Sequence, residues 1–184
     1  MGCEFSGIVR EAFRARGHEA WSCDRFPTEI PSKYHFQGDI GWPLLAYGWD
    51  LLIAFPPCTH LSASGARWWK DKAEVQEDAI KFVKMLAGQD LPRIAIENPV
   101  GRLSTGWRKP DQIIQPWQFG HGETKTTCLW LKNLPKLQPT NIVEGRYPRV
   151  HRMSKTADRW KKRSRTYQGI AEAMADQWGD KLQP

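Results

Sequence analysis

The sequence predicts an α/β fold, with a doubly wound, mostly parallel sheet that carries helices on both faces. Three observations predict it: strand-like and helix-like segments alternate, the segments 49–54 and 93–96 are almost continuously apolar, and polar residues directly follow several strands. Unbroken apolar runs are typical of strands buried on both faces of a parallel sheet, and alternation of strands and helices produces such sheets. With 184 residues, 40% of them hydrophobic, we expect a single domain over 1–184.

Apolar periodicity and turn residues place the elements of the first half. The expected elements are a strand end and turn at 3–7, a helix at 8–16 with Val9, Ala12 and Phe13 on one face and Gly17 at its end, a strand at 20–23, a strand-like segment at 36–39 and a buried strand at 49–54.

The second half continues the alternation. The expected elements are a helix at 72–87 with Val75, Ala79, Phe82, Val83 and Leu86 at helical spacing, a buried strand at 93–96, a basic loop at 101–109, a strand at 126–131 and a helix at 167–178. Pro99 should end the strand that contains 93–96. The segment 139–165 is the least regular and is rich in Arg and Lys.

Composition restricts the partners. The formal charge of +7 and the pI near 9.4 suit a polyanion such as a nucleic acid. The four cysteines form no Cys-x-x-Cys pair, which argues against a metal site and a disulfide framework and favours a reducing compartment. No apolar stretch approaches the roughly 20 residues that span a bilayer. We therefore expect a cytoplasmic protein, with no membrane and no metal.

Chemically useful residues stand at or just after the expected strands. Ligands of open parallel sheets bind beyond the carboxyl ends of the strands, so these residues are the candidate site: Phe5, Ser6, Gly7, Asp24, Asp39, Ile40, Pro56, Pro57, Cys58, Glu97 and Asn98. A lone cysteine is more often an inert, buried side chain than a nucleophile. Pro56 and Pro57 favour a nucleophile over an inert side chain at Cys58, because they stiffen the backbone that leads into this residue. Glu97 is a carboxyl group that could assist a thiolate attacking a pyrimidine ring.

These motifs resemble those of the DNA cytosine-5 methyltransferases, and the whole chain resembles the small phage and prophage proteins of that type. The resemblance implies a Rossmann-like S-adenosylmethionine-dependent methyltransferase fold, and a protein of a bacterial or phage-infected host cell. It implies that Cys58, after Pro57, adds to carbon 6 of cytosine while Glu97 assists. It also implies a set of cofactor-binding residues: Phe5, Ser6 and Gly7 in the cofactor loop, Asp24 at the ribose, Asp39 and Ile40 at the adenine, and Pro56 beside the catalytic motif.

The sequence also departs from the family pattern. Thr59 replaces a common Gln and Pro99 replaces the Val of Glu-Asn-Val, while only about 137–165 is available for a target-recognition region. The DNA substrate is therefore expected to be single-stranded or bound with relaxed sequence preference. Lys125 is the candidate for the family's basic base-contacting residue, and Arg163 and Arg165 are candidates for phosphate contacts.

Two alternatives remain open from the sequence. One is a catalytically weak or inactive nucleic-acid-binding protein on the same fold. The other is modification of a different pyrimidine substrate, either RNA or a nucleotide, because thiolate addition to carbon 6 also underlies uracil chemistry.

Overall fold

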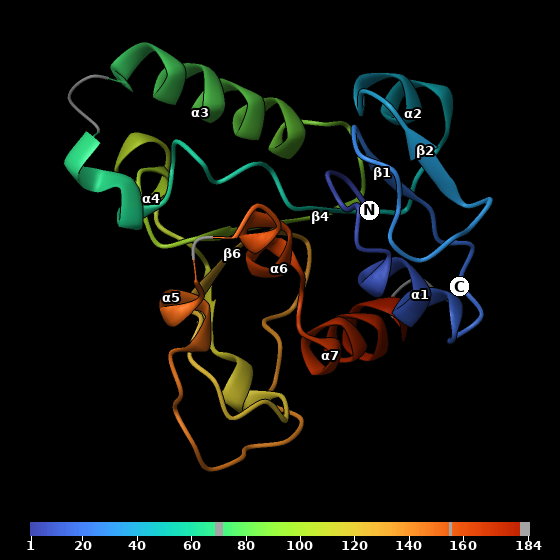
Figure 1. The fold of residues 1–184 in the computed structure, drawn as a ribbon. Helices are drawn as coiled ribbons and strands as arrows, with labels where there is room; N and C mark the ends of the chain where they lie inside the picture. The colour runs from blue at the N-terminus through green and yellow to red at the C-terminus, as the bar shows by residue number, and fades with distance from the viewer. Residues whose placement is uncertain (69–71, 155, 181–184) are drawn as a thin grey trace.

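The structure is a computed structural model that describes residues 1–68, 72–154 and 156–180 (Figure 1). The helices are α1 (Ile8–Arg14), α2 (Gly41–Ala46), α3 (Ala73–Ala87), α4 (Leu103–Gly106), α5 (Arg149–Arg152), α6 (Arg159–Ser164) and α7 (Gln168–Gly179), with 3-10 turns η1 (Ala63–Trp68) and η3 (Pro116–Gln118). The strands are β1 (Ser22–Asp24), β2 (His35–Gln37), β3 (Leu51–Ala54), β4 (Arg93–Pro99), β5 (Gln112–Ile114) and β6 (Thr127–Lys132).

The strands form an α/β arrangement with a mixed sheet. Four strands lie in the order β3-β4-β6-β5, and β1 pairs with β2 beside them. All pairings are parallel except those of β6, which runs antiparallel to both β4 and β5. Gly2 joins the two groups through parallel bridges to Cys23 and Ala54. We call the backbone around Gly2 the Gly2 segment. The complete order is therefore β2, β1, the Gly2 segment, β3, β4, β6 and β5, which is compatible with a Rossmann-like fold.

Helices cover both faces of the sheet (Figure 1). Successive strand residues point to opposite faces, so Ile53 and Ala95 pack with α1 and α7, whereas Leu52 and Ile94 pack with α3. Trp178 of α7 is fully buried in the first cluster. This two-sided packing explains why β3 and the 94–96 part of β4 are apolar at every position.

Several expected elements are confirmed: α1, β3, α3, β6 and α7 lie where the periodicity placed them, and Pro99 ends β4. The strand expected at 20–23 is β1, which begins two residues later and ends one residue later, and α1 ends two residues early. Glu97 and Asn98 were expected to follow their strand, but they lie inside β4. They do so because β6 pairs with this segment, matching Glu97 to Leu129 and Asn98 to Cys128.

Other expectations were wrong in detail. Val75 is 45% exposed, because the buried face of α3 is carried by Gln76, Ile80, Val83 and Leu86. The irregular segment 139–165 contains two short helices, α5 and α6, and both α2 and β5 were not predicted. No helix in the described part of the chain has the length and apolar character needed to cross a membrane.

Candidate active site

The candidate residues meet at one edge of the sheet because of the strand directions. The Gly2 segment, β1, β3 and β4 run parallel, so the residues that follow them lie at the same edge. Because β6 is reversed, the residues that precede it also reach this edge. Lys125, two positions before β6, is thereby brought to the edge that carries Cys58 and Glu97.

The loop after β3 holds Cys58 in a closed turn. Its carbonyl oxygen accepts hydrogen bonds from the backbone N–H groups of Leu61 (3.0 Å) and Ser62 (2.9 Å). Pro56 is buried, Pro57 is exposed and Cys58 is partly buried. Two consecutive prolines fix the φ angles of the backbone that leads into this turn, so the loop itself sets the backbone position of Cys58.

Asn98 joins this loop to β4. Its side-chain Nδ2 donates to the Pro56 carbonyl oxygen at 2.8 Å, and the residue is 1% exposed. The Oδ1 atom of Asn98 is buried and has no hydrogen-bond partner within the described part of the chain. The bond ties the strand of Glu97 to the loop of Cys58 and thereby fixes their relative position.

A second connection follows further along the two segments. Ala63 N donates to the Val100 carbonyl oxygen (2.9 Å), and Arg102 N donates to that of Leu61 (2.7 Å). A Cβ on Gly101 would lie 1.9 Å from the Leu61 oxygen. Only glycine permits this close backbone approach.

Glu97 acts electrostatically on Cys58. Burial raises the pKa of the Cys58 thiol, the Glu97 carboxylate raises it further, and Lys125 and Arg163 lower it. Burial also raises the pKa of Glu97, against a lowering by Lys125. Both acids therefore favour their neutral forms more than they would in water. A neutral carboxyl group can donate a hydrogen bond, which an ionised one cannot.

Lys125 is held in place by residues far away in sequence. Its backbone N–H donates to Gln115 Oε1 (3.1 Å), and Gln115 Nε2 donates to Thr126 Oγ1 (2.8 Å). The Lys125 ammonium donates to the Arg165 carbonyl oxygen at 3.1 Å. Gln115 is thus a positioning residue that no local pattern indicates.

The expected cofactor loop follows the Gly2 segment. Gly7 has φ of 78°, and a Cβ there would lie 2.7 Å from Arg10 Nη2. The Ser6 hydroxyl donates to Glu4 Oε1 at 2.9 Å, and the same oxygen accepts the Val9 backbone N–H at 3.0 Å. The Ser6 side chain is therefore engaged within the protein, whereas Glu4 Oε2 is buried and has no partner among the described residues.

The two expected cofactor acids lie at the ends of the neighbouring strands β1 and β2. Asp24 is half-buried, and burial raises its pKa. Asp39 is exposed, and its pKa is lowered by the Gly41 backbone N–H and by Arg25, which pairs with it at 3.1 Å. Ile40 is buried beside Asp39. Asp24 is thus the less solvated of the two carboxylates.

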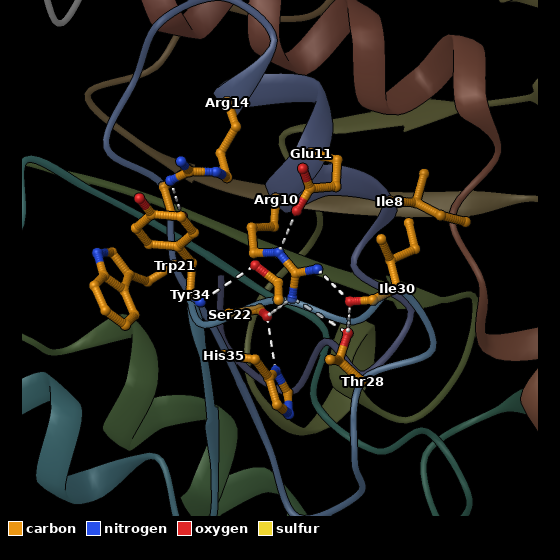
Figure 2. A network of polar contacts seen from close by, with 12 residues as sticks. Ile8, Arg10, Glu11, Arg14, Trp21, Ser22, Thr28, Ile30, Tyr34 and His35 are labelled. Atoms are coloured by element: carbon orange, nitrogen blue, oxygen red, sulfur yellow. Dashed lines mark hydrogen bonds and ion pairs between the residues drawn. The ribbon is translucent and has the colours of Figure 1, made fainter.

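The loop after Asp24 is held by a fully buried arginine, Arg10, which Figure 2 shows at the centre of a polar network. Its guanidinium donates to Ser22 Oγ (2.7 Å), Thr28 Oγ1 (3.2 Å) and the Ile30 carbonyl oxygen (2.8 Å). Its Nε donates to Glu11 at 2.7 Å. Because α1 carries Arg10, the network fixes this loop against the helix that follows the expected cofactor loop.

The Arg- and Lys-rich segment 139–165 contacts the expected cofactor loop and the loop after Asp24. Trp160 of α6 lies 5.7 Å from the Phe5 ring and 4.8 Å from the Phe26 ring, between centroids. Arg165 pairs with Glu29 through two bonds of 2.7 and 2.8 Å. The two expected phosphate-binding residues therefore differ: Arg165 is engaged with Glu29, and Arg163 acts electrostatically on Cys58.

No group of three or more metal-binding side chains occurs within 1–68, 72–154 and 156–180. A scan of the sequence against protein-family models matched no family, and a search of curated proteins found no matching relative. What the site can do chemically therefore follows from its residues and their arrangement.

Proposed function

We propose that this protein is an S-adenosylmethionine-dependent DNA cytosine-5 methyltransferase. The observation that carries the proposal is the pairing of a thiol and a carboxyl group at one sheet edge. Cys58 and Glu97 lie on segments joined by the Asn98–Pro56 hydrogen bond, and the Glu97 carboxylate raises the pKa of the Cys58 thiol. A nucleophile beside a proton donor is what addition to a pyrimidine ring requires.

The strand order supports a methyltransferase fold of the Rossmann type. When the Gly2 segment is counted as the first strand, the order from β2 to β4 is 3-2-1-4-5, which begins the doubly wound order. The direction of winding reverses between the Gly2 segment and β3, and ligands of such sheets bind at that point. The loop of Phe5 leaves one side of this point, and the loop of Cys58 leaves the other.

In the proposed reaction, the Cys58 thiolate forms a bond to carbon 6 of cytosine. The electrons of the ring double bond move toward carbon 5 and the ring nitrogen, where neutral Glu97 donates a hydrogen bond that stabilises the developing charge. S-adenosylmethionine, when bound, would supply the methyl group that carbon 5 receives, with S-adenosylhomocysteine as the leaving group. Carbon 5 then loses its proton to water, and the released electron pair re-forms the double bond as the Cys58–carbon bond breaks.

The residues at the Gly2 side of the site fit this cofactor. Glu4 Oε2 is a buried carboxylate oxygen with no partner among the described residues, and such an atom suits a cationic or hydroxyl-bearing ligand. Asp24 would hold the ribose hydroxyls, Asp39 and Ile40 would hold the adenine, and the aromatic ring of Phe5 would contact the same ligand.

The proposal is tested with single-stranded DNA that contains 5-fluorocytosine, together with labelled S-adenosylmethionine. Release of the enzyme requires carbon 5 to lose its hydrogen as a proton. Fluorine in place of that hydrogen cannot leave as a cation, so the adduct persists. We expect a covalent, labelled complex that disappears in Cys58→Ser and weakens in Glu97→Gln. Cys3→Ser is the matched control and should form the adduct. An adduct that survives Cys58→Ser, or none with the unchanged protein, would refute the proposal.

A second candidate function is nucleic-acid binding without methyl transfer. The raised pKa of Cys58 favours it, because reactive thiols usually have a lowered pKa. Titration calorimetry separates the two: DNA binding with no heat from S-adenosylmethionine would favour the second candidate.

A further inference from the structure

Helix α5 and the residues on either side of it line a surface hollow, which is not part of the site described above. Its volume is about 350 Å³, and it is lined by Tyr147, Pro148, Arg149, Arg152 and Met153. This volume is near the lower end of the range for small-molecule sites, about 300 to 1,000 Å³. The hollow therefore has room for a group of the size of one nucleotide.

The lining combines an aromatic ring with two cations. Tyr147 is 63% exposed, so much of its side chain is open to solvent. Arg149 and Arg152 are exposed as well, and Arg149 approaches Glu123 only to 3.6 Å. No acidic side chain lines the hollow. Stacking of a base on an aromatic ring, beside arginines that contact the backbone phosphates, is how proteins bind single strands.

The hollow lies close to the candidate active site. Tyr147 N donates to the Gly122 carbonyl oxygen, and Thr124 N donates to that of Tyr147, both at 3.1 Å. Lys125, which lowers the pKa of both Cys58 and Glu97, directly follows Thr124. The backbone that carries the aromatic ring is thus hydrogen-bonded to the backbone of Thr124, the residue before Lys125.

Contacts below the hollow hold its position. The Tyr167 hydroxyl donates to Glu123 Oε2 at 2.7 Å, and Arg149 faces the other oxygen of that carboxylate. Tyr167 immediately precedes α7, whose side chains are buried against the sheet. Glu123 therefore connects the wall of the hollow to the core of the protein.

We propose that this hollow binds one nucleotide of single-stranded DNA, next to the cytosine that enters the active site. The base stacks on Tyr147, and Arg149 and Arg152 contact the phosphates. A duplex would not offer the face of a base, whereas a single strand does. The strand is DNA because the proposed reaction takes place on a cytosine of DNA. This inference rests on the proposed function, since the neighbouring nucleotide is the reacting cytosine.

The test is fluorescence anisotropy with the full chain, a labelled 20-nucleotide single-stranded DNA and no S-adenosylmethionine. We expect Tyr147→Ala to weaken binding by about five- to a hundredfold, which is the loss of one stacked base. Tyr147→Phe keeps the ring and should bind nearly as well as the unchanged protein. Arg152→Gln should weaken binding and reduce the slope of log K against log salt by about 0.7.

Lys136→Gln is the matched control for charge. Lys136 is exposed and follows the end of β6, at the opposite edge of the sheet. Its substitution should leave the affinity and the salt slope almost unchanged. Equal losses in Lys136→Gln and Arg152→Gln would overturn the proposal, as would an equal loss in Tyr147→Phe and Tyr147→Ala, or tighter binding of RNA of the same sequence. Circular dichroism melting confirms that each variant is folded.

The binding test and the adduct test can refute the two proposals independently. If DNA binding depends on Tyr147 but no 5-fluorocytosine adduct forms, the hollow is supported and methyl transfer is refuted. If the adduct forms and Tyr147→Ala binds DNA as tightly as the unchanged protein, methyl transfer is supported and the hollow is refuted.

Discussion

Replacing Asn98 with Asp tests whether the link between β4 and the Cys58 loop depends on one side-chain hydrogen bond. Asn98 is 1% exposed, and its Nδ2 donates to the Pro56 carbonyl oxygen at 2.8 Å. Asp has almost the same shape, but an ionised carboxylate has no proton to donate. In Asn98→Asp, two oxygens would face each other unless the new carboxyl group is protonated.

The size of the effect follows from the pKa of the new carboxyl group. Burial and the facing carbonyl oxygen raise this pKa in the folded state above the unfolded value of about 3.9. Between the two values the folded state binds more protons, so stability falls as pH rises through that window. If the pKa rises by about two to three units, the variant is less stable than the parent at pH 7 by about 3 to 4 kcal/mol.

The assay is urea unfolding of parent and variant at several pH values from 5 to 8. The difference in unfolding free energy should grow by up to about 1.4 kcal/mol per pH unit until the raised pKa is passed. Asn133→Asp is the matched control, because Asn133 Nδ2 donates to the Pro92 carbonyl oxygen at 2.9 Å but is exposed. A difference that is independent of pH, or equal in Asn98→Asp and Asn133→Asp, would refute the reasoning.

Three further predictions concern the same region. Gly101→Ala should destabilise the protein by about 2 kcal/mol or more, as seen in urea unfolding, because of the 1.9 Å contact. Gly65→Ala, whose Cβ would meet its nearest atom at 4.0 Å, should not; equal effects would contradict this account. Arg10→Met should cost about 3 kcal/mol through its lost hydrogen bonds, and a loss below about 1 kcal/mol would count against it. Glu97→Gln should lower the pKa of Cys58, so mass spectrometry should find Cys58 alkylated faster by iodoacetamide at pH 8; an unchanged rate would show that the carboxylate does not act on the thiol.

Sequence patterns predicted the longer elements because burial leaves a period that can be counted. β3 and the 94–96 part of β4 are continuously apolar, and α3 and α7 each extend over twelve or more residues. β5 has only three residues, too few to show alternation, and α2 has six and contains Pro43. Short elements such as these are decided by tertiary pairing more than by local pattern.

The parts of the candidate site that could be predicted are those formed by residues adjacent in the sequence. Pro56, Pro57 and Cys58 are adjacent, and Glu97 stands at the end of an apolar run. The motif that contains Glu97 also identifies Asn98. It does not reveal that the Asn98 side chain bonds to a carbonyl oxygen 42 positions away. Arg10 lies among apolar helix positions, and nothing local indicates that a charged side chain there is fully buried.

The pKa directions of Cys58 and Glu97 bear on how the proposed reaction could begin. Two ionised acids at this edge would repel each other, and burial disfavours both charges. One ionised thiol beside a neutral carboxyl group carries a single negative charge, which Lys125 and Arg163 can offset, since both lower the pKa of Cys58. That arrangement is also the one the reaction needs, because the thiolate attacks while the carboxyl proton faces the ring nitrogen. Protonation of Glu97, which its raised pKa makes easier, therefore favours the attacking state of Cys58, because it removes the charge that repels the thiolate.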